Sequence, residues 1–365
     1  MSDKKQDGVA AVNQDFIKYD QVSKEHTYHL AESAGDELFD DDFEIRTCDM
    51  DQFFNGGDNG KARFAQELGT AMSEIGFAII VGHGVDTTLY DDAYDRVIGV
   101  FTKATLDKKL TFRAQRFGSV SQGYFPIKET SDIHPDLVEG WVFCRRAFDM
   151  ECPREAPYDP AEFWPDPNDE PFFRRIVQAH EQLILPLMQS ALTYLGCDPH
   201  LYDRKLTGSN FGFRLNYYPP MDRRDDESGA GRLLGHEDVD LFTILPAPKQ
   251  EGLQVFNRHN CKWIRLSAPP GSIILNTGDY MQRITNDIFP STTHRVGKPR
   301  DGSHMSDARV SIPMAAYTWE DEVLEVLPCC GEPKYEPIKS ITFHTRSTSK
   351  FYGDAYAVES SIDQD

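Results

Sequence analysis

No run of apolar residues in this chain approaches the roughly eighteen that a membrane-spanning helix needs. The first fifteen residues, MSDKKQDGVAAVNQD, likewise contain no apolar segment of the signal-peptide kind. The 7 cysteines form no CxxC pair and follow no regular spacing, which argues against the disulfide framework of a small secreted protein. We therefore expect a cytoplasmic protein without membrane association, whose cysteines are mostly reduced thiols.

Basic residues are also scarce. Lysine and arginine together number 38 against 59 acidic residues, which gives a formal net charge of -21. This charge opposes binding to nucleic acid and to anionic membrane surfaces. We expect a small-molecule substrate, and we favour a monomer.

The chain is long enough to bury a sizeable core, because it has 365 residues of which 39% are hydrophobic. Its composition and patterning predict five segments. These are a polar and acidic N-terminal arm (1–42), an N-terminal region of helices and strands (43–165), a long helix (166–207), a β core (208–320) and a C-terminal segment that covers the site (321–365).

Apolar spacing predicts a helix over residues 62–75, followed directly by a buried strand in GFAIIVGHGV (76–85). A second helix is predicted over residues 172–195, with Gly196 as its stop. The loop-rich segment 115–145 between them is either a wall of the functional site or a structural meander.

Short apolar strands separated by turn signals follow Gly208, and LQVFNRHNCKWIRL reads as a hairpin. Many short strands at this spacing are typical of a sandwich or barrel such as a jelly roll. The predicted fold class is therefore α+β with a mainly β core, a double-stranded β-helix (jelly roll) with flanking helices. The segment NTGDYMQRITND (276–287) is predicted to form a turn and a strand.

The segment GHEDVDLFTIL (235–245) places several charged groups at the entry to a buried strand. Charged side chains rarely enter a core without compensation, and a metal ion could provide it. In a strand, residues i and i+2 share a face, so His236 and Asp238 can both point inward while Glu237 points away. Such a pair alone is weak evidence, because it is as readily an ordinary hydrogen-bonded pair.

A second histidine strengthens the metal interpretation. His294, in STTHRVG, begins another strand-like segment, and a barrel can bring it opposite His236 and Asp238. Two histidines and one carboxylate are the facial triad of non-haem Fe(II) oxygenases, which leaves coordination positions open for chemistry.

Arg309 and Ser311 repeat the i, i+2 arrangement on a later strand, in DARVSIPM. A buried guanidinium requires an anion, and its planar fork fits a carboxylate in bidentate fashion. That anion is either an internal Asp or Glu or the far carboxylate of a dicarboxylic acid that chelates the metal.

With these residues in place, the chain resembles the 2-oxoglutarate/Fe(II)-dependent oxygenases of the isopenicillin N synthase-like family. The matching motifs occur in the family's order between residues 43 and 320. They are GFAIIVGHGV (76–85), RLNYYPP (214–220), GHEDVDLFTIL (235–245), GLQV (252–255), LNTGDYMQRITND (275–287), STTHRV (291–296) and RVS (309–311).

The resemblance implies that His236, Asp238 and His294 hold Fe(II). It also implies that four residues bind the 2-oxoglutarate co-substrate. Arg309 and Ser311 would take its C5 carboxylate, and Tyr218 and Asn216 would contact the co-substrate as well.

The implied activity is a dioxygenase reaction that uses O2, oxidises a small-molecule metabolite and releases succinate and CO2. Hydroxylation is the default outcome, with desaturation or ring closure as variants. The alternative is an Fe(II) oxidase of the isopenicillin N synthase type, which has the same triad but uses no 2-oxoglutarate. A binding barrel without turnover would be expected to have lost a triad residue or Arg309, and neither is lost here.

The sequence does not identify the substrate. Pocket candidates are Tyr124 and Glu139 in the loop-rich segment, Asp240 two positions after the metal carboxylate, and Thr285 in the 275–287 motif. The segment FHTRSTSKFYGDAY near the C-terminus is predicted to cover the site as a helix or loop.

Overall fold

The computed structural model describes residues 38–117, 120–126, 136–154, 156–221, 231–298 and 305–352. Most of the predicted arm (1–42) lies outside the described residues. Its last residues lie against the core, because the backbone amide of Asp40 donates to the carbonyl of Trp263 at 2.9 Å and Asp41 pairs with Arg265 at 2.9 Å.

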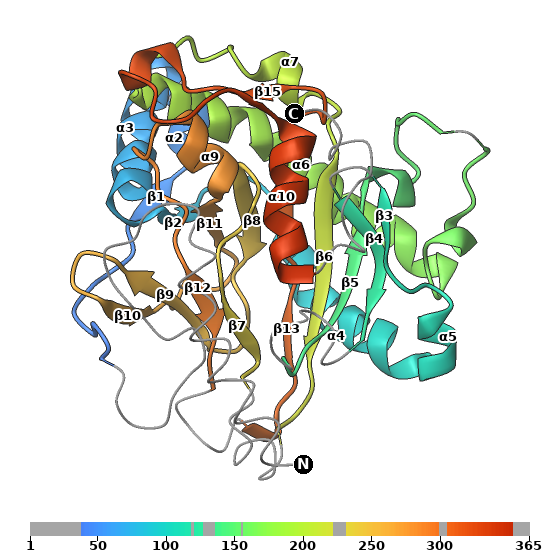
Figure 1. The fold of residues 1–365 in the computed structure, drawn as a ribbon. Coiled ribbons are helices and arrows are strands. Elements are labelled where there is room, and N and C mark those ends of the chain that lie inside the picture. The colour runs from blue at the N-terminus through green and yellow to red at the C-terminus, as the bar shows by residue number, and fades with distance from the viewer. Residues whose placement is uncertain are drawn as a thin grey trace.

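Two β-sheets form the centre of the molecule (Figure 1). The larger is ten-stranded and mixed, and β13 (Arg309–Ser311) joins it by pairing with β6. The other strands in spatial order are β1 (Thr47–Asp49), β2 (Phe77–Val81), β11 (Ile273–Thr277), β8 (Phe242–Pro246), β14 (Met314–Ala316), β6 (Phe211–Tyr218), β5 (Glu139–Phe143), β4 (Val120–Phe125) and β3 (Gln115–Phe117).

The smaller sheet has the order β10 (Lys262–Arg265), β9 (Leu253–Asn257), β12 (His294–Val296) and β7 (Leu233–His236). Strands β9 and β10 form the predicted hairpin. Apolar side chains of this sheet, among them Val255 and Ile264, share one buried cluster with side chains of the large sheet such as Phe77 and Ile274. The two sheets therefore pack face to face, which confirms the α+β class with a jelly-roll core.

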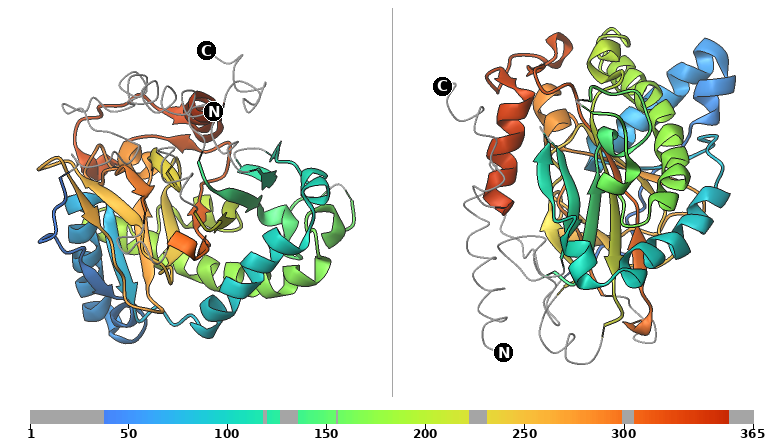
Figure 2. Two further views of the ribbon diagram at one scale, coloured as in Figure 1. Left: turned by 90° about the horizontal axis from the view of Figure 1, so that it is seen from below. Right: turned by 90° about the vertical axis from the view of Figure 1, so that its right-hand side faces the viewer.

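Helices α3 (Gly57–Ile75), α4 (Thr88–Lys103) and α6 (Glu170–Tyr194) pack against strands of the large sheet. Helix α2 (Asp51–Asn55) packs on α3 and helix α7 (Asp203–Leu206) on α6, whereas α5 (Leu106–Leu110) follows α4 and α9 (Asp279–Ile284) follows β11. Helix α10 (Ser340–Tyr352), preceded by the short pair β15 (Val323–Leu324) and β16 (Ile338–Lys339), lies on the opposite side of the sheet from α4 and α6 (Figure 2).

The apolar run of β2 is explained by burial on both faces. Ala78 and Ile80 belong to the large core under the helices, whereas Phe77 and Ile79 belong to the core between the sheets. A strand that is covered on both sides needs apolar residues at every position. This strand, and the predicted helices that became α3 and α6, are confirmed.

Two expectations about local structure were wrong. Residues 276–287 were expected to form a turn and a strand, but they form the end of β11 and then helix α9. Segment 115–145 was expected to be loop-rich, but it contains β3, β4 and β5, which extend the large sheet. Side chains of β4 and β5 also line the cavity described below, so this segment is part of the wall.

Five cysteines are free, whereas Cys197 and Cys329 are joined in a disulfide. The expectation of mostly reduced thiols thus agrees with the structure except at this one pair. Among the described residues, no helix has the length and apolarity required to cross a membrane.

Candidate metal centre and co-substrate pocket

Two histidines face each other across neighbouring strands of the small sheet. His294 on β12 is the direct register partner of His236 on β7, and their ring centroids are 4.4 Å apart. Antiparallel pairing places side chains of such partners on the same face of a sheet. Strand pairing therefore brings together two residues that are 58 positions apart in the sequence (294 minus 236).

Asp238 completes the group from the loop after β7. Its Oδ1 lies 3.6 Å from Nε2 of His236 and 3.8 Å from Nε2 of His294. Strand β7 ends at His236, so the expectation that His236 and Asp238 share one face of a strand as residues i and i+2 does not hold. The two side chains nevertheless converge, and the three residues offer ligand atoms that all lie within 4.8 Å of one another.

The second oxygen of Asp238 is held by two donors from the large sheet. Oδ2 accepts from the Thr243 hydroxyl at 2.6 Å and from the Asn276 amide at 2.8 Å. Thr243 on β8 and Asn276 on β11 are register partners, so they reach the same oxygen from adjacent strands. Burial alone would raise the pKa of the Asp238 carboxyl, but His294, His236 and these two donors outweigh it and lower that pKa below its usual range.

The orientation of His294 suits a metal ligand. Its Nδ1 lies 3.1 Å from the carbonyl oxygen of Thr292, which assigns the ring proton to Nδ1 and leaves the lone pair on Nε2. The ring of Phe77 packs edge-on against the imidazole at a centroid distance of 5.5 Å. The tautomer and the packing both direct Nε2 toward Asp238.

Asp240, for which the sequence offered a substrate role, is fully buried behind Asp238. Its Oδ2 lies 2.7 Å from the Thr243 hydroxyl, and its Oδ1 has no hydrogen-bond partner. Burial and then the neighbouring Asp238 raise the pKa of Asp240 well above its usual range, and the Thr243 hydrogen bond opposes this only in part. Asp240 therefore contacts Thr243, which also holds Asp238, and it lies outside the lining of the cavity.

A cavity of about 260 Å³ contains the three residues and extends between the sheets. Arg309 also lines it, although its side chain is only 1% exposed. Its Nε and Nη1 atoms have no hydrogen-bond partner, and burial lowers the pKa of its guanidinium while Tyr218 partly offsets that effect. A buried cation with unused donors is costly unless an anion binds to it.

The other predicted co-substrate residues surround Arg309. Pairing of β13 with β6 aligns Arg309 with Tyr218 and Ser311 with Asn216. The Arg309 guanidinium lies 4.9 Å from the Tyr218 ring, and the Asn216 amide donates to the Ser311 hydroxyl at 3.2 Å. All four side chains line the same cavity as the metal centre.

Tyr124 and Glu139 have partners outside the cavity. The Tyr124 hydroxyl donates to Oε2 of Glu139 at 2.6 Å, and Lys109 forms an ion pair with the same oxygen at 2.5 Å. Neither side chain belongs to the cavity lining. The structure thus gives the two residues a shared role in the packing of β4 and β5.

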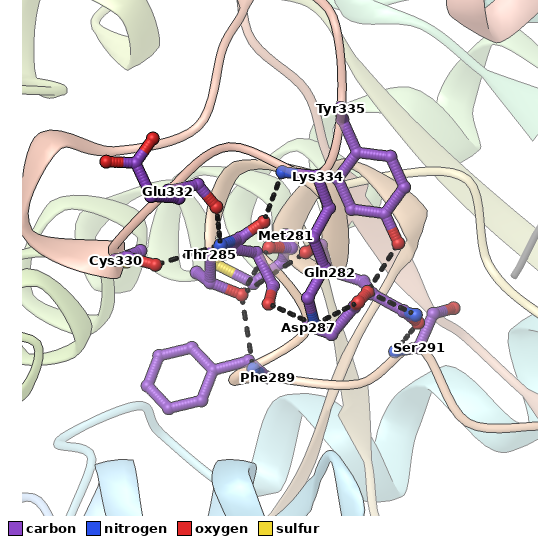
Figure 3. Close-up of polar contacts among 11 residues, drawn as sticks. Met281, Gln282, Thr285, Asp287, Phe289, Ser291, Cys330, Glu332, Lys334 and Tyr335 are labelled. Carbon is purple, nitrogen blue, oxygen red and sulfur yellow. Dashed lines mark hydrogen bonds and ion pairs between the residues drawn. The ribbon is translucent and has the colours of Figure 1, made fainter.

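Thr285 belongs to a structural network at the end of α9. Its hydroxyl donates to the carbonyl of Met281 at 2.8 Å and accepts from the amide of Phe289 at 3.1 Å (Figure 3). The side chain is fully buried and does not line the cavity. A helix in place of the expected strand accounts for this position.

Several residues of the site were not predicted from the sequence. Thr243 and Asn276 were missed because only the register of β8 against β11 brings them to Asp238. His344 and Thr348 of helix α10 line the cavity and were missed because the sequence predicted a cover without its inward-facing residues. Arg214 was missed although it stands in RLNYYPP with Asn216 and Tyr218, at the same two-residue spacing.

Comparison with known families agrees with this geometry. The family described as the 2OG-Fe(II) oxygenase superfamily matches residues 209–315, and the family described as non-haem dioxygenase in morphine synthesis N-terminal matches residues 45–167. The first match contains the metal centre and the Arg309 pocket.

Curated relatives are similar along most of the chain. The 2-oxoglutarate-Fe(II) type oxidoreductase ppzC of Metarhizium majus is 27% identical over 337 residues, which cover 85% of this chain and 88% of the relative. The proline hydroxylase buaE of Petromyces alliaceus is 28% identical over 287 residues, which cover 74% and 86%. Relatives of this kind do not favour the alternative of an oxidase that uses no 2-oxoglutarate.

Among solved structures, a full-length Neurospora crassa protein in complex with α-ketoglutarate and 5-formyluracil has the same fold. Its TM-score is 0.73 at 21% identity, and the match covers 87% of this chain and 99% of that one. With two family matches, curated relatives and a triad in place, the chain belongs to the 2OG-Fe(II) oxygenase superfamily and is a non-haem dioxygenase dependent on Fe(II), 2-oxoglutarate and O2.

Proposed function

We propose that His236, Asp238 and His294 are the ligands of the Fe(II). One observation carries the assignment, namely that their ligand atoms lie within 4.8 Å of one another in the cavity that also contains the unpaired Arg309. Two imidazoles and one carboxylate on one side of the ion leave positions on its other side open. The paired donors on Oδ2 of Asp238 leave Oδ1 for the metal.

We further propose that the buried end of the cavity receives 2-oxoglutarate. The unused Nε and Nη1 of Arg309 would bind the C5 carboxylate, and the hydroxyls of Ser311 and Tyr218 with the amide of Asn216 would complete its hydrogen bonds. The chemistry of this donor set fits the co-substrate, since no other anion among the described residues is paired with the Arg309 guanidinium.

When bound, Fe(II) and 2-oxoglutarate would activate O2, which oxidises both the co-substrate, to succinate and CO2, and a C–H bond of the substrate. The chain's own residues position the proposed metal ligands and shield the cavity from water. Thr243 and Asn276 fix the carboxylate plane of Asp238, Thr292 fixes the His294 ring, and apolar walls such as Phe77 and Leu245 limit the entry of water.

The substrate that we propose is a small metabolite, oxidised by hydroxylation or by a desaturation or ring closure. The size of the cavity and the excess of acidic residues support a small molecule over a polyanion. Proline, the substrate class in the name of one relative, and 5-formyluracil, present in one similar structure, are reasonable first compounds. A monomeric state, a cytoplasmic location and the five-segment division of the chain remain predictions.

The experiment that tests the site is anaerobic addition of Fe(II) and then 2-oxoglutarate to the full chain, with the visible charge-transfer band of the chelate as the readout. We expect the band in the native protein, no band in Asp238→Ala, and at least a tenfold weaker 2-oxoglutarate response in Arg309→Ala. The exposed Arg46, which pairs with Glu74, offers the control Arg46→Ala.

The absence of the band in the native protein would contradict the proposed site. A band that is retained at full strength in Arg309→Ala would place the co-substrate elsewhere. Oxygen-dependent succinate release then distinguishes the dioxygenase from an oxidase, because only the former consumes 2-oxoglutarate.

A further inference from the structure

The cavity contains a second guanidinium that the metal and the co-substrate do not use. Arg214 on β6 lines the cavity along with Asn216 and Tyr218 of the same strand. Residues at i, i+2 and i+4 share one face of a strand, so the three side chains follow one line across the wall. The line begins at the Arg309 pocket with Tyr218 and ends at Arg214.

Nothing among the described residues neutralises Arg214. Its buried Nε has no hydrogen-bond partner, and its one side-chain contact of defined geometry is with the ring of Phe125, 5.8 Å from the guanidinium carbon. Among the described carboxylates, none forms an ion pair with it. An arginine in a cavity wall without an anion loses hydration and gains little in return.

The neighbouring strand leaves room for this guanidinium. A Cβ added to Gly140 on β5 would lie 2.9 Å from Nη2 of Arg214, a distance that real Cβ atoms do not tolerate. The absence of a side chain at Gly140 thus leaves space beside β5 that the Arg214 guanidinium occupies.

The co-substrate does not explain Arg214. Four residues separate it from Tyr218, which corresponds to about 13 Å along a strand. The carbon chain of 2-oxoglutarate spans only about 5 Å between its carboxyl carbons, by standard bond lengths. With one end at Arg309 and the other at the metal, the co-substrate leaves Arg214 free for a different anion.

We infer that Arg214 is a specificity-determining residue that binds a carboxylate of the primary substrate, so that the substrate class is a small carboxylic acid. The inference rests on the proposed function, since it assumes that Arg309 is used by 2-oxoglutarate. A chain with a net charge of -21 repels small anions in general, and a local guanidinium provides the attraction that an acidic substrate requires.

The test uses the full chain with Fe(II) and 2-oxoglutarate under anaerobic conditions, and the melting temperature as the readout. The probes are three acids (N-acetyl-L-proline, hexanoic acid and indole-3-acetic acid), each paired with its neutral amide. We expect at least one acid to raise the melting temperature more than its amide does. Arg214→Gln should remove this difference and raise the apparent Kd of that acid about tenfold to 100-fold.

Two further variants separate charge from geometry. Arg214→Lys keeps the positive charge without the planar guanidinium and should give an intermediate Kd for the acid. Gly140→Ala should weaken binding of the acid, because the added methyl group displaces the guanidinium. Arg46→Gln, at an exposed arginine, is the matched control and should retain the full difference between acid and amide.

Three outcomes overturn the inference. In the first, no acid raises the melting temperature of the native protein more than its amide does. In the second, the difference in melting temperature between acid and amide persists in Arg214→Gln, and in the third, Arg214→Gln loses the 2-oxoglutarate chelate band. The band also distinguishes the two proposals, because its absence from the native protein contradicts the proposed function itself. Its presence in Arg214→Gln without an acid response supports Arg214 as the anchor of the substrate.

Discussion

The hydroxyl oxygen of Thr243 lies 2.6 Å from Oδ2 of Asp238, and a second buried carboxylate, that of Asp240, lies 2.7 Å from the same hydroxyl. One hydroxyl has one proton to donate, so it can donate to only one of the two carboxylates. Asp238, a proposed iron ligand, is therefore held by a short chain of polar groups, in which the hydrogen bonding of each group affects the next.

Replacement of Thr243 should weaken iron binding without removing a ligand. Thr243→Val deletes one of two donors to Oδ2 of Asp238, and loss of such a supporting contact typically lowers metal affinity by roughly 10-fold to 100-fold. Titration of the apoprotein with Fe(II) under anaerobic conditions measures this. Thr243→Ser restores the hydroxyl and should bind iron nearly as the native protein does. Equal affinity in Thr243→Val would show that Asn276 alone positions Asp238.

Asp240 should tolerate a neutral isostere. If Thr243 donates to Asp238, the contact between Asp240 and Thr243 requires a donor on Asp240, which either a protonated acid or an amide provides. We expect Asp240→Asn to change the free energy of unfolding by less than about 1 kcal/mol, and Asp240→Ala to be clearly more destabilising. Urea unfolding of the two variants is the measurement. Similar losses in both would mean that the negative charge of Asp240 is required.

Arg309 should reduce the stability of the protein when the co-substrate is absent. Its guanidinium is buried and leaves Nε and Nη1 unpaired, so Arg309→Met should raise the melting temperature of the apoprotein, corresponding to roughly 1 kcal/mol or more. The same change should abolish the additional stabilisation that 2-oxoglutarate gives to the Fe(II)-loaded protein. Thermal unfolding with and without the two ligands tests both parts, and a less stable Arg309→Met apoprotein would contradict the first.

His180 should make stability depend on pH. It is fully buried on α6, its Nε2 lies 3.0 Å from the Tyr90 hydroxyl, and burial followed by the nearby His83 lowers its pKa to about 3. Between that value and its unfolded pKa near 6.5, only the unfolded chain binds the proton, so stability is present above about pH 6.5 and is lost as the pH falls. The loss attributable to His180 at pH 5 is about 2 kcal/mol.

The measurement is the free energy of urea unfolding at pH 7.5 and at pH 5. His180→Gln should lose about 2 kcal/mol less than the native protein over this interval. His259→Gln, at an exposed histidine, should behave like the native protein. Identical pH dependence in the native protein and in His180→Gln would show that His180 is protonated in the folded state.

The contact between α3 and α6 should not tolerate a methyl group at Gly69. A Cβ at this position would lie 1.9 Å from Cγ of Tyr194, so either the Tyr194 ring or the two helices would have to move. We expect Gly69→Ala to cost about 3 kcal/mol or more in stability. The double variant with Tyr194→Ala should be more stable than the sum of the single changes predicts. Simple additivity of the two changes would contradict the close approach.

Chemistry and spacing were sufficient to group three residues that the structure brings together. The residue types of His236, Asp238 and His294 predict an Fe(II) site, and the strand pairing of the two histidines places them close to each other. The strand geometry assumed for His236 and Asp238 was wrong, because β7 ends at His236. For Arg309 and Ser311 the same reasoning agrees with the structure, because β13 is a regular strand over both residues.

The residues that sequence reasoning missed or assigned to the wrong role depend on long-range register or on local structure that apolar patterns do not determine. Asn276 reaches Asp238 because β11 pairs with β8 in one particular alignment, which a single sequence does not reveal. Thr285 was placed in a strand because apolar residues in NTGDYMQRITND fit either period over so short a distance. Asp240 was ambiguous for a related reason, since a strand-end charge and a buried acid look alike in sequence.

The position of helix α10 has a consequence for shortened forms of the enzyme. His344 and Thr348 form part of the cavity wall, yet they follow the whole triad and Arg309 in the chain. A chain that stops after residue 339, through a nonsense codon or proteolysis, would retain the whole iron triad and Arg309 but have an open cavity. Such a product would keep every proposed ligand of the metal and the co-substrate, in a cavity that is more open to solvent where His344 and Thr348 line it.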